Sequence, residues 1–261
     1  MSELAVAAFA AETGTHLVDV PRASRFAAFR AGFDEAAYRR DLEHLGVRWL
    51  ARSDPAFPSL LRAIHDPPAG LFLRGAGDAG LLGRPAVAVV GARSCSPYGR
   101  NVARTLGGVL AAAGLVVVSG LARGVDGEAH RGALEAPDGV TVAVLGCGVD
   151  RDYPAAHAEL ATRICERGLV ASEYAPGVEP APWRFPARNR IIGGLARATV
   201  VVEARERSGA LITADFALEE GREVFACPGE ITSEMSPSGD VLTALFAPIA
   251  VTGAPPSGGH V

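Results

Sequence analysis

The chain has 261 residues, of which 49% are hydrophobic and 21% charged, which excludes a disordered chain because such a composition can bury an ample core. Its 29 acidic residues outnumber its 25 basic residues, all of them arginine, and the formal net charge is −4. This balance excludes a uniformly basic nucleic-acid-binding surface but allows a local basic groove.

The first part of the chain is predicted to be helical. Apolar residues such as Leu42, Leu45 and Leu50 lie on one face of residues 1 to about 50, between charged positions. Four prolines between residues 55 and 68 then predict an extended connector whose leucines and isoleucine pack as an arm (Leu60, Leu61, Ile64 and Leu71). We therefore expect a small N-terminal helical region over residues 1–53.

From Pro85 onward, short apolar runs alternate with segments of helical periodicity. Buried parallel strands have this pattern, because helices cover both faces of the sheet. The predicted strands are Ala86–Val90, Leu115–Val118, Val140–Leu145, Leu169–Ala171, Thr199–Val202 and Glu223–Ala226. The predicted helices between them are Tyr98–Ala113, Asp126–Glu135, Ala155–Arg167, Arg188–Leu195 and Leu211–Glu220. The pattern predicts an α/β fold with a doubly wound, mostly parallel, extended Rossmann-like sheet over residues 54–252, and a flexible tail over 253–261.

Neither a metal, a cofactor nor a membrane is indicated. The four cysteines (Cys95, Cys147, Cys165 and Cys227) form no C-x-x-C pair and have no histidine at zinc-ligand spacing. The longest apolar run, Val109–Val118, is broken by Gly114 and is too short to cross a bilayer. The apolar start of the chain carries Glu3 and lacks a positive leader. We expect a cytoplasmic protein with no cofactor.

The loops that follow the first two predicted strands carry candidate ligand-binding residues. In an open α/β sheet, ligands bind outside the carboxyl ends of the strands, where helix N-termini present amide donors. The first loop offers Arg93 and Ser94, and it matches neither a dinucleotide-binding nor a P-loop motif. The second offers Ser119, Gly120 and Arg123. Asp126 and His130 follow it, and we expect both to be structural.

Two later segments add further candidates. Arg188, Asn189 and Arg190 lie at a predicted helix start, where the two arginines cannot both point the same way. The loop after the fifth strand carries Arg207, Ser208 and Gly209, with Thr213 as a further donor. Arginine, serine or glycine thus follows four of the six strands, which suits an extended polyanion.

An ordered set of motifs resembles the bacterial DNA-processing protein A (DprA/Smf) family. The motifs are VGARSCSPYG, SGLARGVDGEAHRGAL, VLGCGVDRDYP, SEYAPG, FPARNRIIGGL and VVVEARERSGALITADFALEEGREVFACPG, preceded by DPAFPSLLRAIHDPPAGLFLRG. The resemblance runs from about Asp54 to about Gly239. The sequence departs from the family in the altered segment after Pro228, the shorter N-terminal part and the expected absence of a C-terminal winged helix.

The resemblance implies a binding protein rather than an enzyme. Members bind single-stranded DNA, usually as homodimers, and help load the RecA recombinase during natural transformation. It implies a groove formed by Arg93, by Arg188, Asn189 and Arg190, and by Arg207 with Ser208 and Gly209. Single strands are held through phosphates and base stacking, and the candidate stacking residues are Tyr98, Tyr153, Trp183 and Phe185. We expect Arg93, Arg190 and Arg207 to converge on one rim.

Two other functions remain open from the sequence. A nucleotide phosphoribohydrolase of the LOG type would need paired glycines and a glutamate that the segment Ser208–Thr213 lacks, although Glu203 is a conceivable acid/base. A nucleotide sensor would present a similar loop edge but would not prefer a long strand to a mononucleotide.

Overall fold

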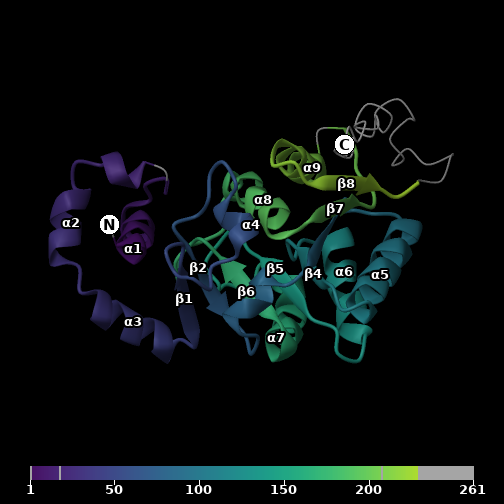
Figure 1. The fold of residues 1–261 in the computed structure, drawn as a ribbon, viewed down its shortest axis with the longest axis horizontal. Coiled ribbons are helices and arrows are strands. Elements are labelled where there is room, and N and C mark those ends of the chain that lie inside the picture. Colours follow the sequence, from purple (N-terminus) through teal and green to yellow (C-terminus); the bar gives the residue numbers. More distant parts are fainter. Residues whose placement is uncertain (1, 18, 207, 229–261) are drawn as a thin grey trace, which may run out of the picture.

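The computed structural model describes residues 2–17, 19–206 and 208–228, and its centre is one eight-stranded sheet (Figure 1). The strand order is β1-β2-β6-β5-β4-β3-β7-β8. The six strands from β6 to β8 in this order are mutually parallel, and β1 and β2 add an antiparallel edge. Their bounds are β1 Val47–Ala51, β2 Gly70–Arg74, β3 Ala86–Val90, β4 Val116–Ser119, β5 Thr141–Val144, β6 Leu169–Ser172, β7 Ala198–Val201 and β8 Glu223–Ala226. All six strands predicted after residue 85 are confirmed, to within two residues.

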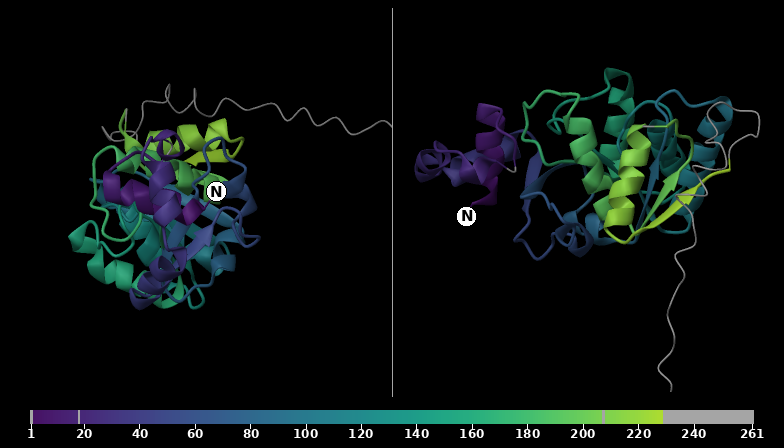
Figure 2. Two further views of the ribbon diagram at one scale, coloured as in Figure 1. Left: turned by 90° about the vertical axis from the view of Figure 1, so that its left-hand side faces the viewer. Right: turned by 90° about the horizontal axis from the view of Figure 1, so that it is seen from above.

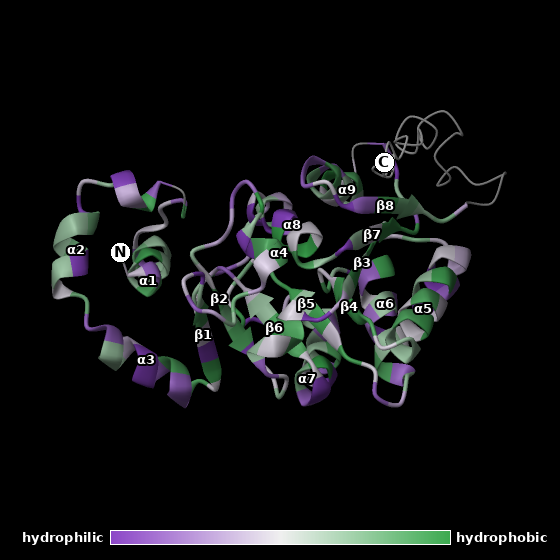
Figure 3. Ribbon diagram, in the orientation of Figure 1, coloured by the Kyte–Doolittle hydropathy of each residue, from purple (hydrophilic) through white to green (hydrophobic). Residues whose placement is uncertain are grey.

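Helices cover both faces of this sheet. Alternate strand residues pack against opposite layers: Val89 belongs to the core beneath α5 and α6, whereas Ala88 and Val90 belong to the core beneath α8 and α9. The helices of the first layer are α5 (Pro97–Ala112), α6 (Val125–Glu135) and α7 (Ala158–Arg167), and those of the second are α4 (Ser59–Arg62), α8 (Arg184–Leu195) and α9 (Gly209–Glu219). This double cover explains why the central strands β3 to β6 are mostly apolar (Figure 3).

The N-terminal helices lie at one end of the molecule, beside the β1 edge (Figures 1 and 2). They are α1 (Glu3–Thr13), α2 (Phe26–Gly32) and α3 (Glu35–His44), and Phe9 packs against Phe26 and Phe29 in a small core of their own. The helical prediction fails beyond His44. Residues 47–51 form β1, in which Leu50 is buried, whereas Leu45 is exposed.

The connector also differs from the prediction of an extended arm. Its leucines enter α4, and residues 70–74 form β2, which pairs with both β1 and β6. Leu61, Ile64 and Leu71 are buried in the main core. The boundary at residue 53 stays a prediction, and the tail over 253–261 lies outside the described residues.

The chain reverses its direction of winding between β3 and β7. It runs from β3 through β4 and β5 to β6 on one side, and β7 and β8 then lie on the other side of β3. Such a switch point opens a crevice at the carboxyl ends of the two strands. In the described part of the chain, no helix is both long and apolar enough to cross a membrane.

Candidate functional site

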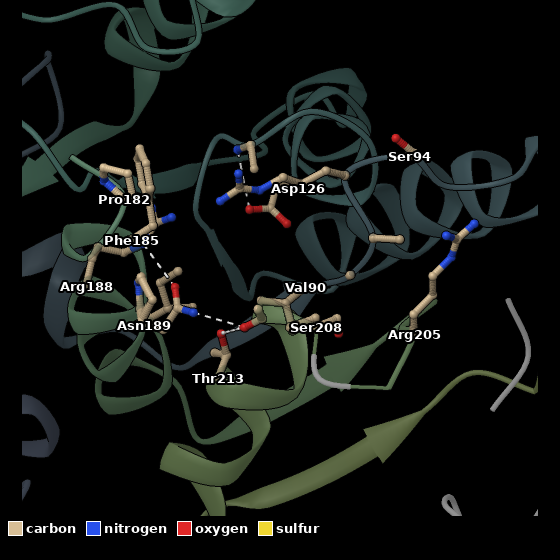
Figure 4. A pocket seen from close by; sticks show the side chains of 18 of the residues that line it. Val90, Ser94, Asp126, Pro182, Phe185, Arg188, Asn189, Arg205, Ser208 and Thr213 are labelled. Carbon is tan, nitrogen blue, oxygen red and sulfur yellow. Dashed lines mark hydrogen bonds between the residues drawn. The ribbon is translucent and has the colours of Figure 1, made fainter. Parts of the chain in front are cut away.

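A cavity of about 740 Å³ opens at this switch point (Figure 4), and we call it the switch-point pocket. The turns after β3 and β7 and the N-terminal half of α8 form most of its wall, with contributions from the loops after β4 and β5. Its lining includes Val90, Gly91, Arg93, Ser94, Asp126, Tyr153, Pro182, Phe185, Arg188, Asn189, Arg205, Ser208, Gly209 and Thr213.

The turn that carries Arg93 is tied to both of its neighbours. The amide of Ala92 donates to the carbonyl of Glu203 at 2.7 Å, and the Ala92 carbonyl accepts from the amide of Val125 at 3.2 Å. The second bond brings α6 so near that a Cβ at Gly124, whose φ is +75°, would collide with the Ala92 carbonyl. Arg93 is therefore presented from a fixed backbone position.

Arg93 lies over an aromatic pair at the pocket wall. Its guanidinium carbon is 5.3 Å from the centroid of the Phe185 ring, a cation–π distance. The Tyr153 ring stacks on the Phe185 ring, with 5.4 Å between the ring centroids and an interplanar angle of 19°. Tyr153 is 42% exposed, so a flat aromatic surface is open to solvent beside an exposed arginine.

Arg188 is a buried cation in the wall of the pocket. It is 4% exposed, and its Nη1 donates to the carbonyls of Gly120, at 2.9 Å, and Val144. Burial lowers the pKa of Arg188 to about 10, and the charge of Asp126 opposes that shift. A Cβ at Gly120 would lie 2.7 Å from Arg188 Nη2 and from Asp126 Oδ2, which explains the glycine.

Two carboxylates of the protein occupy the amide groups around α5 and α6. Glu203 accepts from the Ser96 amide at 2.8 Å and from the Ser96 hydroxyl, at the N-terminus of α5. Asp126 accepts from the amides of Gly120, at 3.1 Å, and Ala122, at 3.4 Å, in the turn before α6. Burial raises the pKa of Asp126, whereas Arg188 and these amides oppose the rise. Both carboxylates thus serve the fold.

The N-terminus of α9 differs from that of α5, because no side chain caps it. Asn189 Nδ2 donates to the Gly209 carbonyl at 3.0 Å, and the Thr213 hydroxyl donates to the same oxygen at 3.4 Å. Among the described residues, the buried hydroxyl of Ser208 has no hydrogen-bond partner. The first turn of α9 therefore faces the pocket with donors available to an anion.

Two predicted site residues are directed away from the pocket. Arg190, 9% exposed, binds Glu173 through two bonds of 2.9 and 2.7 Å and Asp66 through one of 2.9 Å. Burial acts to lower the pKa of Arg190, but these carboxylates raise it above its ordinary value. Ser119 is fully buried and donates to the Val89 carbonyl at 2.6 Å. The expected convergence of Arg93 and Arg190 on one rim is therefore wrong, and Arg207 lies outside the described residues.

Arg123 is exposed but lies beside the switch-point pocket rather than in it. It lines a neighbouring cavity of about 340 Å³, which we call the arginine pocket. The lining of the arginine pocket is Arg93, Arg100, Arg123, Gly124, Glu128, Arg131, Ala156 and His157. Arg93 is thus common to both pockets.

Three arginines that line the two pockets were not predicted from the sequence: Arg205, Arg100 and Arg131. Arg205 follows the end of β7 much as Arg93 follows the end of β3, so the position after a strand could have indicated it. Among the candidate aromatic residues, Tyr153 and Phe185 line the switch-point pocket. The Tyr98 hydroxyl instead donates to the Pro228 carbonyl at 2.9 Å, and the Trp183 ring lies 4.1 Å from that of His16.

Comparisons with known proteins agree on one family. The family model described as DNA recombination-mediator protein A matches residues 48–252. DNA processing protein DprA of Streptococcus pneumoniae is 48% identical over 212 residues, which cover 79% of this chain and 73% of that protein. Across the curated relatives compared, the aligned share of the relative runs from 39% to 73%.

Two solved structures are similar to this fold. The X-ray structure of DNA processing protein A from Streptococcus pneumoniae matches with a TM-score of 0.75 and 38% identity, over 93% of this chain and 87% of that one. DNA processing protein A from Helicobacter pylori matches with a TM-score of 0.66 and 30% identity, over 76% of this chain and 86% of that one. The latter structure is described as showing a single-stranded DNA binding mode.

Proposed function

This chain belongs to the DNA recombination-mediator protein A family, and on that premise we propose that its switch-point pocket binds single-stranded DNA during recombination. The observation that carries the proposal is the Arg93–Phe185–Tyr153 stack beside the uncapped start of α9. A nucleotide needs these two elements: a flat apolar surface for its base and cationic or amide donors for its phosphate.

The aromatic wall supports a single strand over a duplex. A base can stack on Tyr153 or Phe185 only when it has left the stack of a double helix. The relevant walls of the pocket are Phe185 and Pro182 on one side and Arg205 and Ser94 on the other (Figure 4). A base with its attached phosphate can enter between them, and base–aromatic stacking contributes about 1–3 kcal/mol per base.

The helix ends support a phosphate beside that base. Glu203 and Asp126 already occupy the amides around α5 and α6, so the protein supplies its own anions there. The first turn of α9 has no such carboxylate, and Arg93 and Arg205 line the same pocket. A phosphate at Ser208 and Gly209 would fill this position.

The same contacts support binding without catalysis. Glu203, the conceivable acid/base of a phosphoribohydrolase, is buried and engaged by Ser96. Asp126 is buried and engaged by two backbone amides. RecA loading, a homodimer and a cytoplasmic location belong to this proposal through the family resemblance.

Fluorescence anisotropy with labelled oligothymidylate tests the proposal. We expect the single strand to bind more tightly than a duplex of equal length. AMP should compete with the single strand only at far higher concentrations. Arg93→Ala should weaken binding, whereas Arg40→Ala, which removes an exposed arginine of α3, should not. Equal affinity for AMP and the oligonucleotide would indicate a nucleotide sensor, and no binding of the single strand would refute the proposal.

A further inference from the structure

The arginine pocket adjoins the switch-point pocket, and Arg93 separates the two. Arg93 is part of both linings, and its backbone is fixed because Ala92 bonds to Glu203 on one side and Val125 on the other. A chain-like ligand that leaves the switch-point pocket past Arg93 therefore enters the arginine pocket. The two cavities thus meet at Arg93, beside the carboxyl ends of β3 and β4.

The arginine pocket carries unbalanced positive charge. Glu128 is the acidic residue of its lining, and it already pairs with Arg131 at 2.9 Å and Arg104 at 3.4 Å. Within the described parts of the chain, Arg93, Arg100 and Arg123 have no ion-pair partner. These cations create a local field that attracts a polyanion, although the net charge of the whole chain is −4.

The packing of α6 keeps basic groups at this surface. A Cβ at Gly127 would lie 2.6 Å from Cε1 of His157 and 3.1 Å from Nη1 of Arg131. The His157 ring is held in turn by a 2.9 Å hydrogen bond between its Nδ1 and the Leu121 carbonyl. The absence of a side chain at Gly127 therefore allows Arg131 and His157 to pack over the start of α6.

The two pockets differ in what they offer a nucleotide. The switch-point pocket has the aromatic rings of Tyr153 and Phe185, whereas the arginine pocket is lined by no tyrosine, phenylalanine or tryptophan among the described residues. Cations without a stacking surface suit a sugar–phosphate backbone rather than a base.

Resting on the proposed function, we propose that the arginine pocket is a second phosphate site, which holds the backbone of the same DNA strand after it leaves the switch-point pocket past Arg93. Arg100 and Arg123 contact phosphates there. The site contributes to affinity for strands long enough to reach it, without regard to base sequence.

Oligothymidylates of increasing length, from a trinucleotide to a twenty-nucleotide strand, test this second site by anisotropy at several salt concentrations. Arg100→Gln and Arg123→Gln should each weaken binding of the long strand. Each should also reduce the log–log salt slope of that binding by about 0.7, the value for one lost phosphate contact. Both variants should bind the trinucleotide as the unaltered protein does. Arg40→Gln is the matched control, and a thermal melt confirms that each variant is folded.

The outcomes separate the two proposals. If the unaltered protein binds neither length, the proposed function fails. Suppose instead that the unaltered protein binds both lengths. The second site is then refuted if Arg100→Gln and Arg123→Gln leave binding of the long strand unchanged, or if they weaken binding of the trinucleotide to the same extent. The last measurement is a thermal melt with added inorganic phosphate. If phosphate raises the Tm of the unaltered protein but not of Arg123→Gln, and this variant binds the long strand normally, the pocket holds a free anion and the proposal is overturned.

Discussion

The guanidinium of Arg93 lies over the ring of Phe185, with 5.3 Å between its central carbon and the ring centroid. Arg93 comes from the turn after β3 and Phe185 from the first turn of α8, so two segments about ninety residues apart meet at the mouth of the pocket. The contact places a charge and an aromatic face side by side, where a nucleotide presents a phosphate and a base.

Substitutions of these two residues should separate charge from stacking. Phe185→Ala should weaken single-stranded DNA binding by about 1–3 kcal/mol through lost stacking and leave the salt slope unchanged. Arg93→Ala should reduce that slope by about 0.7, because it removes a phosphate contact. Anisotropy titrations over a range of salt concentrations measure both quantities, and equal changes of slope in the two variants would contradict this division of roles.

Ser208→Ala should affect binding without affecting stability. The loss of a serine at a helix N-cap ordinarily costs about 1 kcal/mol, because its oxygen accepts from a backbone amide. Ser208 makes no such bond to α9, so urea denaturation should give an unchanged free energy of unfolding. If the hydroxyl binds a phosphate, affinity for the single strand should fall. Ser96→Ala is the contrasting control, since Ser96 does cap α5 by accepting from Gly99 at 3.0 Å, and it should lower stability.

Arg190→Ala should destabilise the fold. It would leave Glu173, which is 3% exposed, as a buried charge without its main partner, and breaking such a pair costs about 3–5 kcal/mol. The double variant Arg190→Met with Glu173→Leu should recover much of that loss, because neither charge remains buried. Urea denaturation measures the free energy of unfolding of both variants. A single variant as stable as the unaltered protein would show that the pair does not support the fold.

The buried residue His130 should make stability depend on pH. Burial lowers the pKa of His130 from 6.5 to about 3, so the unfolded chain binds a proton that the folded chain excludes. The free energy of unfolding is therefore unaffected by the titration of His130 above pH 6.5. It falls as the pH drops from 6.5 towards 3, by up to about 1.4 kcal/mol per pH unit.

Urea denaturation at pH 7 and pH 5 of the unaltered protein and of His130→Asn measures this contribution. The loss of stability on acidification should be smaller in the variant. His44→Asn, which removes an exposed histidine, should keep the original dependence. If His130→Asn shows the same loss as the unaltered protein, the neutral buried imidazole is not its source.

The structure also identifies the tautomer of His130. Its Nδ1 lies 2.7 Å from the Thr141 hydroxyl oxygen, and that hydroxyl donates its one proton to the Val117 carbonyl at 2.6 Å. Nδ1 must therefore carry the proton and donate it to Thr141. This agrees with a structural role for His130, as the sequence indicated.

Much of the fold follows from local pattern. Strands buried on both faces are mostly apolar, so β3 to β6 were evident as short runs separated by helical periods, and β7 and β8 had the same local pattern. The antiparallel edge was not evident. The two buried residues of β1, Val47 and Leu50, are three positions apart, a spacing that also fits a helix, and pairing with β2 decides between the two.

The sequence by itself determined the fold class and indicated the edge of the sheet where we propose that a ligand binds, because strand periodicity and the loops after strands are local properties. Only the tertiary structure decided which arginines face that ligand. Arg188 and Arg190 are two positions apart on α8 and point about 200° apart around its axis, since each residue turns a helix by about 100°. The packing of α8 sets its rotation, and it directs Arg190 to Glu173 while Arg93, Arg205, Tyr153 and Phe185 meet from separate segments of the chain.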